Sequence, residues 1–124
     1  MRIVGTATLP PGTGTRAVNV GVLLNSVEII VCGKNGADTI GHASIGKYVD
    51  GGNARAVTFS ADGSNAQSVA PLSGKIIQLK EKIGGVWTVV FEAEITPFSG
   101  THVNLDVTVA TASHLYTILI DGWT

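Results

Sequence analysis

The segment GHASIGKYVDGG, residues 41–52, comes closer to known catalytic motifs than any other part of this sequence. Gly41, Gly46 and Lys47 have nearly the spacing of a phosphate-binding loop, but Tyr48 stands where that loop needs Ser or Thr to hold magnesium. Ser44 and Lys47 have the Ser-x-x-Lys spacing of the nucleophile pair in penicillin-recognising enzymes. The residue types alone would therefore permit phosphate binding or acyl transfer.

Both motifs fail because the segment predicts a β-strand. A phosphate-binding loop must lead into a helix, whereas Asp50-Gly51-Gly52-Asn53 is a turn signal only a few residues further on. Side chains three residues apart lie on opposite faces of a strand, so Ser44 cannot work with Lys47. We instead expect a strand over 40–49, whose face from His42 to Tyr48 is covered by a neighbouring subunit.

No metal, cofactor or catalytic set is predicted. The histidines are His42, His102 and His114. His102 and Asp106 share a strand face, but four residues of strand separate them by about 13 Å, whereas zinc needs its donors within about 2.2 Å of one ion. The Asp-Gly turns at 50–53 and 62–65 have oxygen ligands that calcium could use, but these residues are also ordinary turn chemistry. We expect the protein not to be an enzyme.

A polar strand face with aromatic residues nearby is a candidate glycan-binding surface. In 101–109, His102, Asn104, Asp106 and Thr108 alternate with apolar residues. Such a polar stripe flanked by aromatic rings is typical of sugar-binding proteins, and it is equally typical of any strand that faces water. The residues we assign to possible glycan binding are Trp87, His102 and Trp123.

The composition favours a protein that assembles with other subunits. The chain has 124 residues, enough for one domain with its own core, and a formal net charge of −1, which predicts no nucleic-acid partner. No apolar run reaches the roughly 20 residues that span a membrane. Charged residues make up only 14% of the chain, against about 25% in an average domain. A small protein with so little charge is expected to bury part of its surface against partners.

Alternation of apolar and polar residues predicts an all-β protein. The expected strands cover 2–8, 17–24, 26–32, 40–49, 55–61, 75–83, 86–95, 101–109 and 114–121. Turn residues separate them, and Gly84-Gly85 predicts the clearest hairpin. Eight to ten short strands with frequent turns indicate a single antiparallel β-sandwich of jelly-roll type.

Two of these strands, 26–32 and 114–121, are apolar on both faces. One face of a strand in an antiparallel sandwich normally meets water, so an apolar second face indicates either a covering loop or contact with another subunit. The residues we assign to a possible subunit interface are Ile30, Tyr48, Leu115, Tyr116 and Leu119.

Three segments in order carry a resemblance to a known group of proteins. They are Val31-Cys32-Gly33-Lys34 with His42-x-Ser44-x-Gly46 and Asp50-Gly51; Gly85-Val86-Trp87-Thr88 with Phe91-x-Ala93 and Phe98; and Leu105-x-Val107-x-x-Ala110-Thr111-Ala112 with Tyr116 and the closing Asp121-Gly122-Trp123. Together they resemble small β-sandwich virion proteins of tailed bacteriophages and prophages, of the decoration or fibre-associated type.

The resemblance implies a structural role in a bacteriophage virion that is assembled in the host cytoplasm. The expected function is that of a capsid decoration or cement subunit, which stabilises the particle through apolar contacts with other subunits. Its expected partners are copies of itself, as a homotrimer or higher homo-oligomer, and the major capsid protein or another virion protein. The alternative is a lectin-like module of a tail fibre, in which receptor binding means contact with a host glycan. Residues 1–25 lie outside the resemblance and are a possible anchoring arm.

Overall fold

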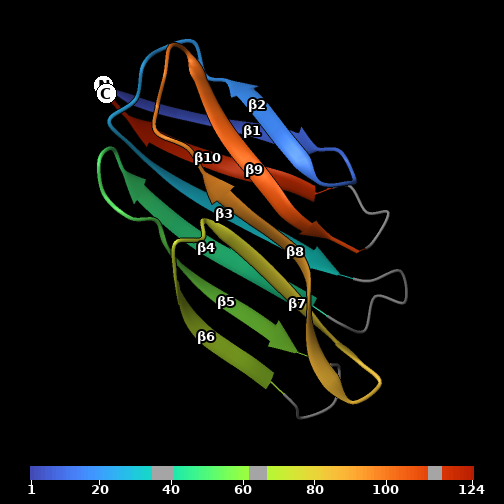
Figure 1. Cartoon of the computed structure of the whole chain (residues 1–124). Coiled ribbons are helices and arrows are strands. Elements are labelled where there is room, and N and C mark those ends of the chain that lie inside the picture. Colours follow the sequence, from blue (N-terminus) through green and yellow to red (C-terminus); the bar gives the residue numbers. More distant parts are fainter. Residues whose placement is uncertain (35–40, 62–66, 112–115) are drawn as a thin grey trace.

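The computed structural model describes residues 1–34, 41–61, 67–111 and 116–124, and these form an antiparallel β-sandwich (Figure 1). The expectation of an all-β sandwich is therefore confirmed. In chain order the strands are β1 (Arg2–Leu9), β2 (Gly14–Asn19), β3 (Ser26–Lys34), β4 (Gly41–Val49), β5 (Arg55–Ala61), β6 (Gln67–Ser73), β7 (Ile77–Ile83), β8 (Val86–Ile95), β9 (His102–Ala110) and β10 (Tyr116–Trp123).

The strands form a six-stranded sheet of order β1-β10-β3-β4-β5-β6 and a four-stranded sheet of order β2-β9-β8-β7. β1 pairs with β10 and β2 with β9, so the two ends of the chain are nested as in a jelly roll, whereas β3 to β6 form a meander within one sheet. The two termini lie side by side (Figure 1), where the Met1 ammonium donates to Thr124 Oγ1 at 3.0 Å. The nested pairing explains why both ends of the chain belong to the same compact unit.

The core lies between the sheets and follows from strand alternation. In β3, Val27, Ile29 and Val31 are buried, and in β9, Val103, Leu105 and Val107 are buried. β8 departs from strict alternation, because its register against β7 shifts between Leu79 and Lys80: Leu79 pairs with Phe91 and Lys80 with Val89, so Val90 is an extra residue. Both Val90 and Phe91 are buried, because a bulge of this kind turns an extra apolar side chain towards the core.

The Gly84-Gly85 hairpin is confirmed, and two other expectations about strands are corrected. Both glycines have positive φ, 58° and 81°, as a two-residue turn requires. The strand expected at 17–24 is β2, which ends at Asn19 because Gly21 has φ 80° and donates its N–H to Asn19 Oδ1. β6 is a strand that the expected set lacks; it lies at the sheet edge, where its Pro71 is tolerated.

The two sheets approach each other closely where β4 meets the residue before β7. A Cβ atom added to Gly46 would lie 1.8 Å from the carbonyl oxygen of Ile76. Only glycine fits between these two backbones, so this residue of the GHASIGKYVDGG segment serves packing between the sheets.

Residues 1–25 contribute one strand to each sheet, and their possible role in anchoring stays a prediction. β1 pairs along its whole length with β10, from Arg2 opposite Trp123 to Leu9 opposite Tyr116. β2 pairs with β9 in the other sheet, and the buried side chains of Leu9 and Leu24 belong to the core. The N-terminal segment is thus part of the sandwich itself.

In the described part of the chain, no helix has the length and apolar character needed to cross a membrane.

Candidate functional site

The polar residues of the GHASIGKYVDGG segment serve the fold, because they cap the free edge of β7. His42 and Ser44 lie on β4 and point inward, and both are buried. Ser44 Oγ accepts a hydrogen bond of 3.1 Å from the backbone N–H of Gln78. His42 Nδ1 lies 3.1 Å from the carbonyl oxygen of Lys80, and because a carbonyl only accepts, Nδ1 carries the proton. These side chains satisfy backbone groups that no neighbouring strand pairs with.

Two expected interface residues, Tyr48 and Tyr116, are core residues instead. Each is 4% exposed within the single chain. The Tyr48 ring packs against Phe98 with ring centroids 5.2 Å apart, and the Tyr116 ring packs against Phe91 at 4.7 Å. Burial, together with the charge of Glu81, raises the pKa of Tyr116 to about 12. The expectation that a neighbouring subunit covers them is corrected, because the chain's own second sheet does so.

Two other expected interface residues, Ile30 and Leu119, lie side by side on the outer face of the six-stranded sheet, which is the side turned away from the four-stranded sheet. Leu119 pairs with Ile30 in the register between β10 and β3, and it is 38% exposed. Ile30 is half-buried by its neighbours on the same face. Leu115, the fifth residue expected at an interface, lies outside the described residues, as does His114.

The register of the sheet extends this pair into a row of apolar residues that crosses five strands, which we call the apolar band. Its members are Leu119, Ile30, Ile45, Val57 and Pro71. Ile45, at the centre, is 42% exposed. A second row beside it contains Cys32, Ala43, Phe59 and Val69, of which Val69 is 63% exposed. Apolar residues scattered singly are normal on a protein surface, whereas contiguous ones more often mark an interaction site.

A row of charged side chains runs parallel to the apolar band, two residues away along the strands, and we call it the charged row. Its members are Asp121 on β10, Glu28 on β3, Lys47 on β4 and Arg55 on β5. The acids are on one half of the sheet and the bases on the other. Asp121 also holds the Arg2 guanidinium, with Nε and one terminal nitrogen at 2.8 and 2.7 Å from its two oxygens. That hydrogen bond and ion pair lower the pKa of Asp121.

The outer face of the four-stranded sheet is polar. His102 and Thr108 are exposed, and Asn104 and Asp106 are half-buried, as the alternation of 101–109 predicts. On β8, Glu92 accepts hydrogen bonds from Gln78 Nε2 at 2.7 Å and pairs with Lys75 at 3.1 Å. Burial alone would raise the pKa of Glu92, but these contacts outweigh burial and lower it. This face is solvated and carries its own ion pairs.

The three residues expected to bind a glycan are not brought together. Trp87 lies beside the hairpin end of β8, under the Lys82 ammonium, which is 5.8 Å from the ring centroid. His102 begins β9 at the opposite end of the same sheet, roughly 35 Å away at the usual rise per residue. Trp123 belongs to β10 of the other sheet, where Lys47 lies over its ring. These three residues therefore do not share one surface, and glycan binding by any of them stays a prediction.

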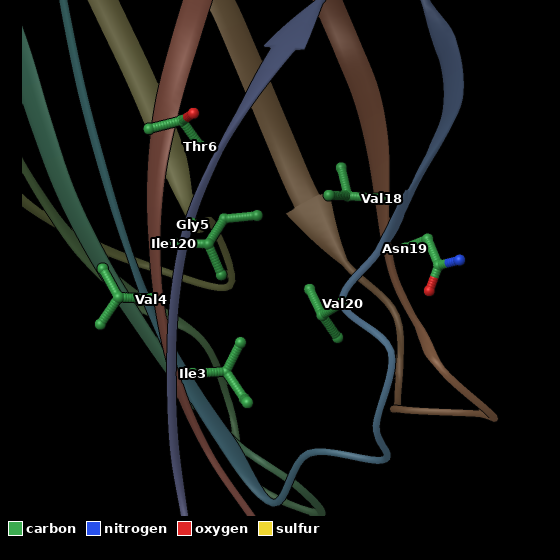
Figure 2. Close-up of a pocket in the computed structure, with 8 residues that line it drawn as sticks. All are labelled: Ile3, Val4, Gly5, Thr6, Val18, Asn19, Val20 and Ile120. Carbon is green, nitrogen blue, oxygen red and sulfur yellow. The ribbon is translucent and has the colours of Figure 1, made fainter.

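A cleft of about 220 Å³ opens between β1 and β2, at the side of the sandwich where the two edge strands face each other. Figure 2 shows Ile3, Val18, Val20 and Ile120 pointing into this gap, while Val4 and Asn19 point away. Ligand pockets are usually larger, about 300–1,000 Å³, and have convergent polar groups. The side chains that point into this cleft are apolar and supply no convergent polar groups. We therefore interpret the cleft as the gap between the edge strands of the two sheets, not as a ligand site.

A second hollow, of about 300 Å³, lies on the outer face of the six-stranded sheet. It is shallow and is formed by β4, β5 and β6, with Ile45, Val57 and Pro71 of the apolar band and Lys47 and Arg55 of the charged row around it. This hollow is a depression in the apolar surface, and side chains of a partner would fit into it.

Among the described residues, no three His, Cys, Asp or Glu side chains are grouped so that they could hold a metal ion. The Asp50 carboxylate accepts hydrogen bonds from the Tyr48 hydroxyl and from the backbone N–H of Phe98, each at 3.3 Å, and so ties its turn to the segment between β8 and β9. The aspartate of the second Asp-Gly turn lies outside the described residues. Cys32 is a free thiol exposed beside the apolar band.

Comparison with known proteins gives no match to this chain, whether to a family model, to a curated protein or to a solved structure.

Proposed function

We propose that this protein is a structural subunit of a bacteriophage virion, and specifically a capsid decoration subunit that acts through protein–protein contacts rather than catalysis. The observation that carries the proposal is the apolar outer face of the six-stranded sheet, with Ile45 and Leu119 well exposed at its centre. A lone subunit would keep this face in water, whereas a subunit in an array buries it.

The proposed mechanism is burial of apolar surface across junctions between subunits. Each square ångström of apolar surface removed from water contributes about 25 cal/mol, so repeated copies on a particle would add a large total stabilisation. The partners we propose are further copies of the chain and the major capsid protein or another virion protein.

Two of the four sheet edges are poorly suited to binding partners by strand addition, which favours contact through a face. Pro71 in β6 lacks a backbone N–H for pairing. The free edge of β7 is occupied by His42 and Ser44 of the same chain. Natural sandwiches protect their edges in such ways against uncontrolled pairing. The outer face of the six-stranded sheet remains as the extended apolar surface.

The alternative function, a lectin-like module of a tail fibre, has no comparable support. Trp87, His102 and Trp123 lie too far apart to stack on one sugar, and a glycan site needs convergent aromatic and polar groups. We therefore advance only the structural function.

Two measurements test the proposal together. Sedimentation equilibrium of the purified protein from micromolar to millimolar concentration is expected to show reversible self-association. Mass spectrometry of phage particles purified from cells that encode the chain is expected to find it in stoichiometric amount with the capsid protein. A protein that stays monomeric throughout and is absent from particles would refute the proposed function.

A further inference from the structure

The apolar band and the charged row together specify how two copies of this chain fit each other. We propose that two copies stack face to face through the outer faces of their six-stranded sheets, about a two-fold axis that runs parallel to the strands between β3 and β4. This inference rests on the proposed function, because it assumes that the apolar face is buried by a partner, and it names that partner and its orientation.

The two-fold symmetry follows because both copies make the contact through the same face. When the same surface of two identical chains meets itself, the contact is isologous and its operator is a two-fold axis. The six strands place β3 and β4 at the centre of the sheet. An axis between them sets β4 of one copy over β3 of the other, β5 over β10, and β6 over β1. The elementary contact is thus two-fold, which differs from the three-fold contact that the resemblance to trimeric virion proteins implies.

This axis lays the apolar band of one copy along the apolar band of the other. Ile45 of one copy meets Ile30 of the second copy, and Val57 meets Leu119, because these residues share one row of the register. The hollow of about 300 Å³ among β4, β5 and β6 then faces β10 of the second copy. Leu119, which is 38% exposed, projects towards that hollow. Packed sheets stand about 10 Å apart, which lets such side chains interdigitate.

The charged row selects this axis over one at right angles to it. About an axis parallel to the strands, Glu28 of one copy meets Lys47 of the second, and Asp121 meets Arg55, since acids and bases occupy opposite halves of one row. About an axis across the strands, the row would lie over another part of the face and these pairs would not form. Arg2 already holds Asp121, so the pair nearest the axis, Glu28 with Lys47, carries most of the selectivity.

The area of the face is close to the smallest that specific contacts bury. Six strands about 4.8 Å apart, over about 20 Å of their length, give a face of roughly 500 Å² per copy before the relief of side chains is counted. Relief increases the true area, so two faces together approach the roughly 1,200 Å² that marks the lower end of specific interfaces.

Charge reversal followed by mixing tests the proposal. Glu28→Lys and Lys47→Glu are each expected to weaken self-association at least about tenfold at low salt, because each variant places like charges across the axis. An equimolar mixture of the two is expected to associate within about threefold of the original protein, since every cross-axis pair in the mixed dimer is again opposite in sign. Contacts within one chain cannot produce this rescue. Asp106→Lys, the same reversal on the other sheet, is the matched control and leaves association unchanged.

Cross-linking gives a second measurement that does not depend on charge. Two proteins, Leu119→Cys and Val57→Cys, each also carry Cys32→Ala. Treated with a short bis-maleimide, the mixture is expected to give covalent dimers faster than either protein alone, because position 119 faces position 57 across the axis. Two copies of the same position lie three strand spacings apart, about 14 Å sideways across the axis.

The outcomes separate the two proposals. Association of the original protein that is insensitive to both reversals, or cross-linking that is equally fast in the separate proteins, overturns the two-fold stacking and leaves the structural function standing. A protein that never associates and is absent from phage particles overturns both. Circular dichroism and urea unfolding establish that each variant is folded before its association is measured.

Discussion

The outer faces of the two sheets differ, although the same alternation of residues builds both. On the four-stranded sheet the outward positions hold His102, Asn104, Asp106 and Thr108, and Lys75 and Glu92 form an ion pair. On the six-stranded sheet the central outward positions hold the apolar band. Both faces back onto the same core, so packing within the chain does not explain the difference.

The difference supports the proposal that the outer face of the six-stranded sheet is covered by a partner, whereas that of the four-stranded sheet meets water. Contiguous exposed apolar residues more often mark an interaction surface than a solvated one. Four substitutions test this contrast.

The largest expected effect comes from Gly46→Ala, which tests whether the inner side of the six-stranded sheet is closed by the chain itself. The added Cβ would lie 1.8 Å from the Ile76 carbonyl oxygen, and backbone cannot rotate away. We expect a loss of about 3 kcal/mol or more in the free energy of unfolding, measured by urea denaturation. Gly5→Ala is the control, because its Cβ would meet nothing within 4 Å. Equal stability of the two variants would mean that the sheets do not approach at Gly46.

The second effect is on association and contrasts the two outer faces directly. Ile45→Arg places an unpaired charge at the centre of the apolar band, where burial in an interface costs about 2 kcal/mol or more, or about 30-fold in affinity. Sedimentation measures the change. Thr108→Arg makes the same substitution at an exposed position of the polar face and should leave association unchanged. If Ile45→Arg and Thr108→Arg weakened association equally, the apolar face would not be the contact surface.

The third effect concerns the polar face, where Lys75→Met removes the cation between Glu92 and Glu94. We expect a loss of about 1 kcal/mol in the free energy of unfolding near neutral pH, because these side chains are partly exposed. The pKa of Glu92 is lowered in the folded state from 4.5. Its contribution is therefore present above about pH 4.5 and is lost as the pH falls through the folded-state pKa.

Urea unfolding across pH 2 to 7 checks this. Lys75→Met should flatten the rise of stability with pH, and a dependence identical to that of the original protein would show that the cation does not stabilise the Glu92 carboxylate.

The smallest effect is expected at the edge of the six-stranded sheet, where the Arg2–Asp121 pair is exposed. Arg2→Met should raise the pKa of Asp121 towards its ordinary value, because the guanidinium that lowers it is gone. Carbon-detected NMR titration measures this pKa. High salt should shift it in the same direction in the original protein, since ions screen exposed pairs. A pKa unaffected by either change would show that the pair does not form in solution.

Local patterns were sufficient for much of the fold. Alternation predicted the strand that contains the GHASIGKYVDGG segment, and two adjacent glycines predicted the hairpin at Gly84, because side-chain period and turn conformation are properties of short segments. The strand β6 was not predicted. A strand tolerates a proline such as Pro71 when it lies at a sheet edge, and a short-range sequence pattern does not reveal which strands lie at an edge.

Alternation was enough to predict which residues of a strand share a face, including Ile45 with Lys47 and His42 with Tyr48. Which of the two faces meets the second sheet depends on the folded arrangement, and that arrangement places Tyr48 in the core rather than at an interface. The folded arrangement also determines which strands are neighbours. Because β10, β3, β4 and β5 lie next to one another, one row of the sheet contains Leu119, Ile30, Ile45 and Val57. Alternation is a local consequence of backbone geometry, whereas register joins residues far apart in the chain and is fixed by the packing of the whole sandwich.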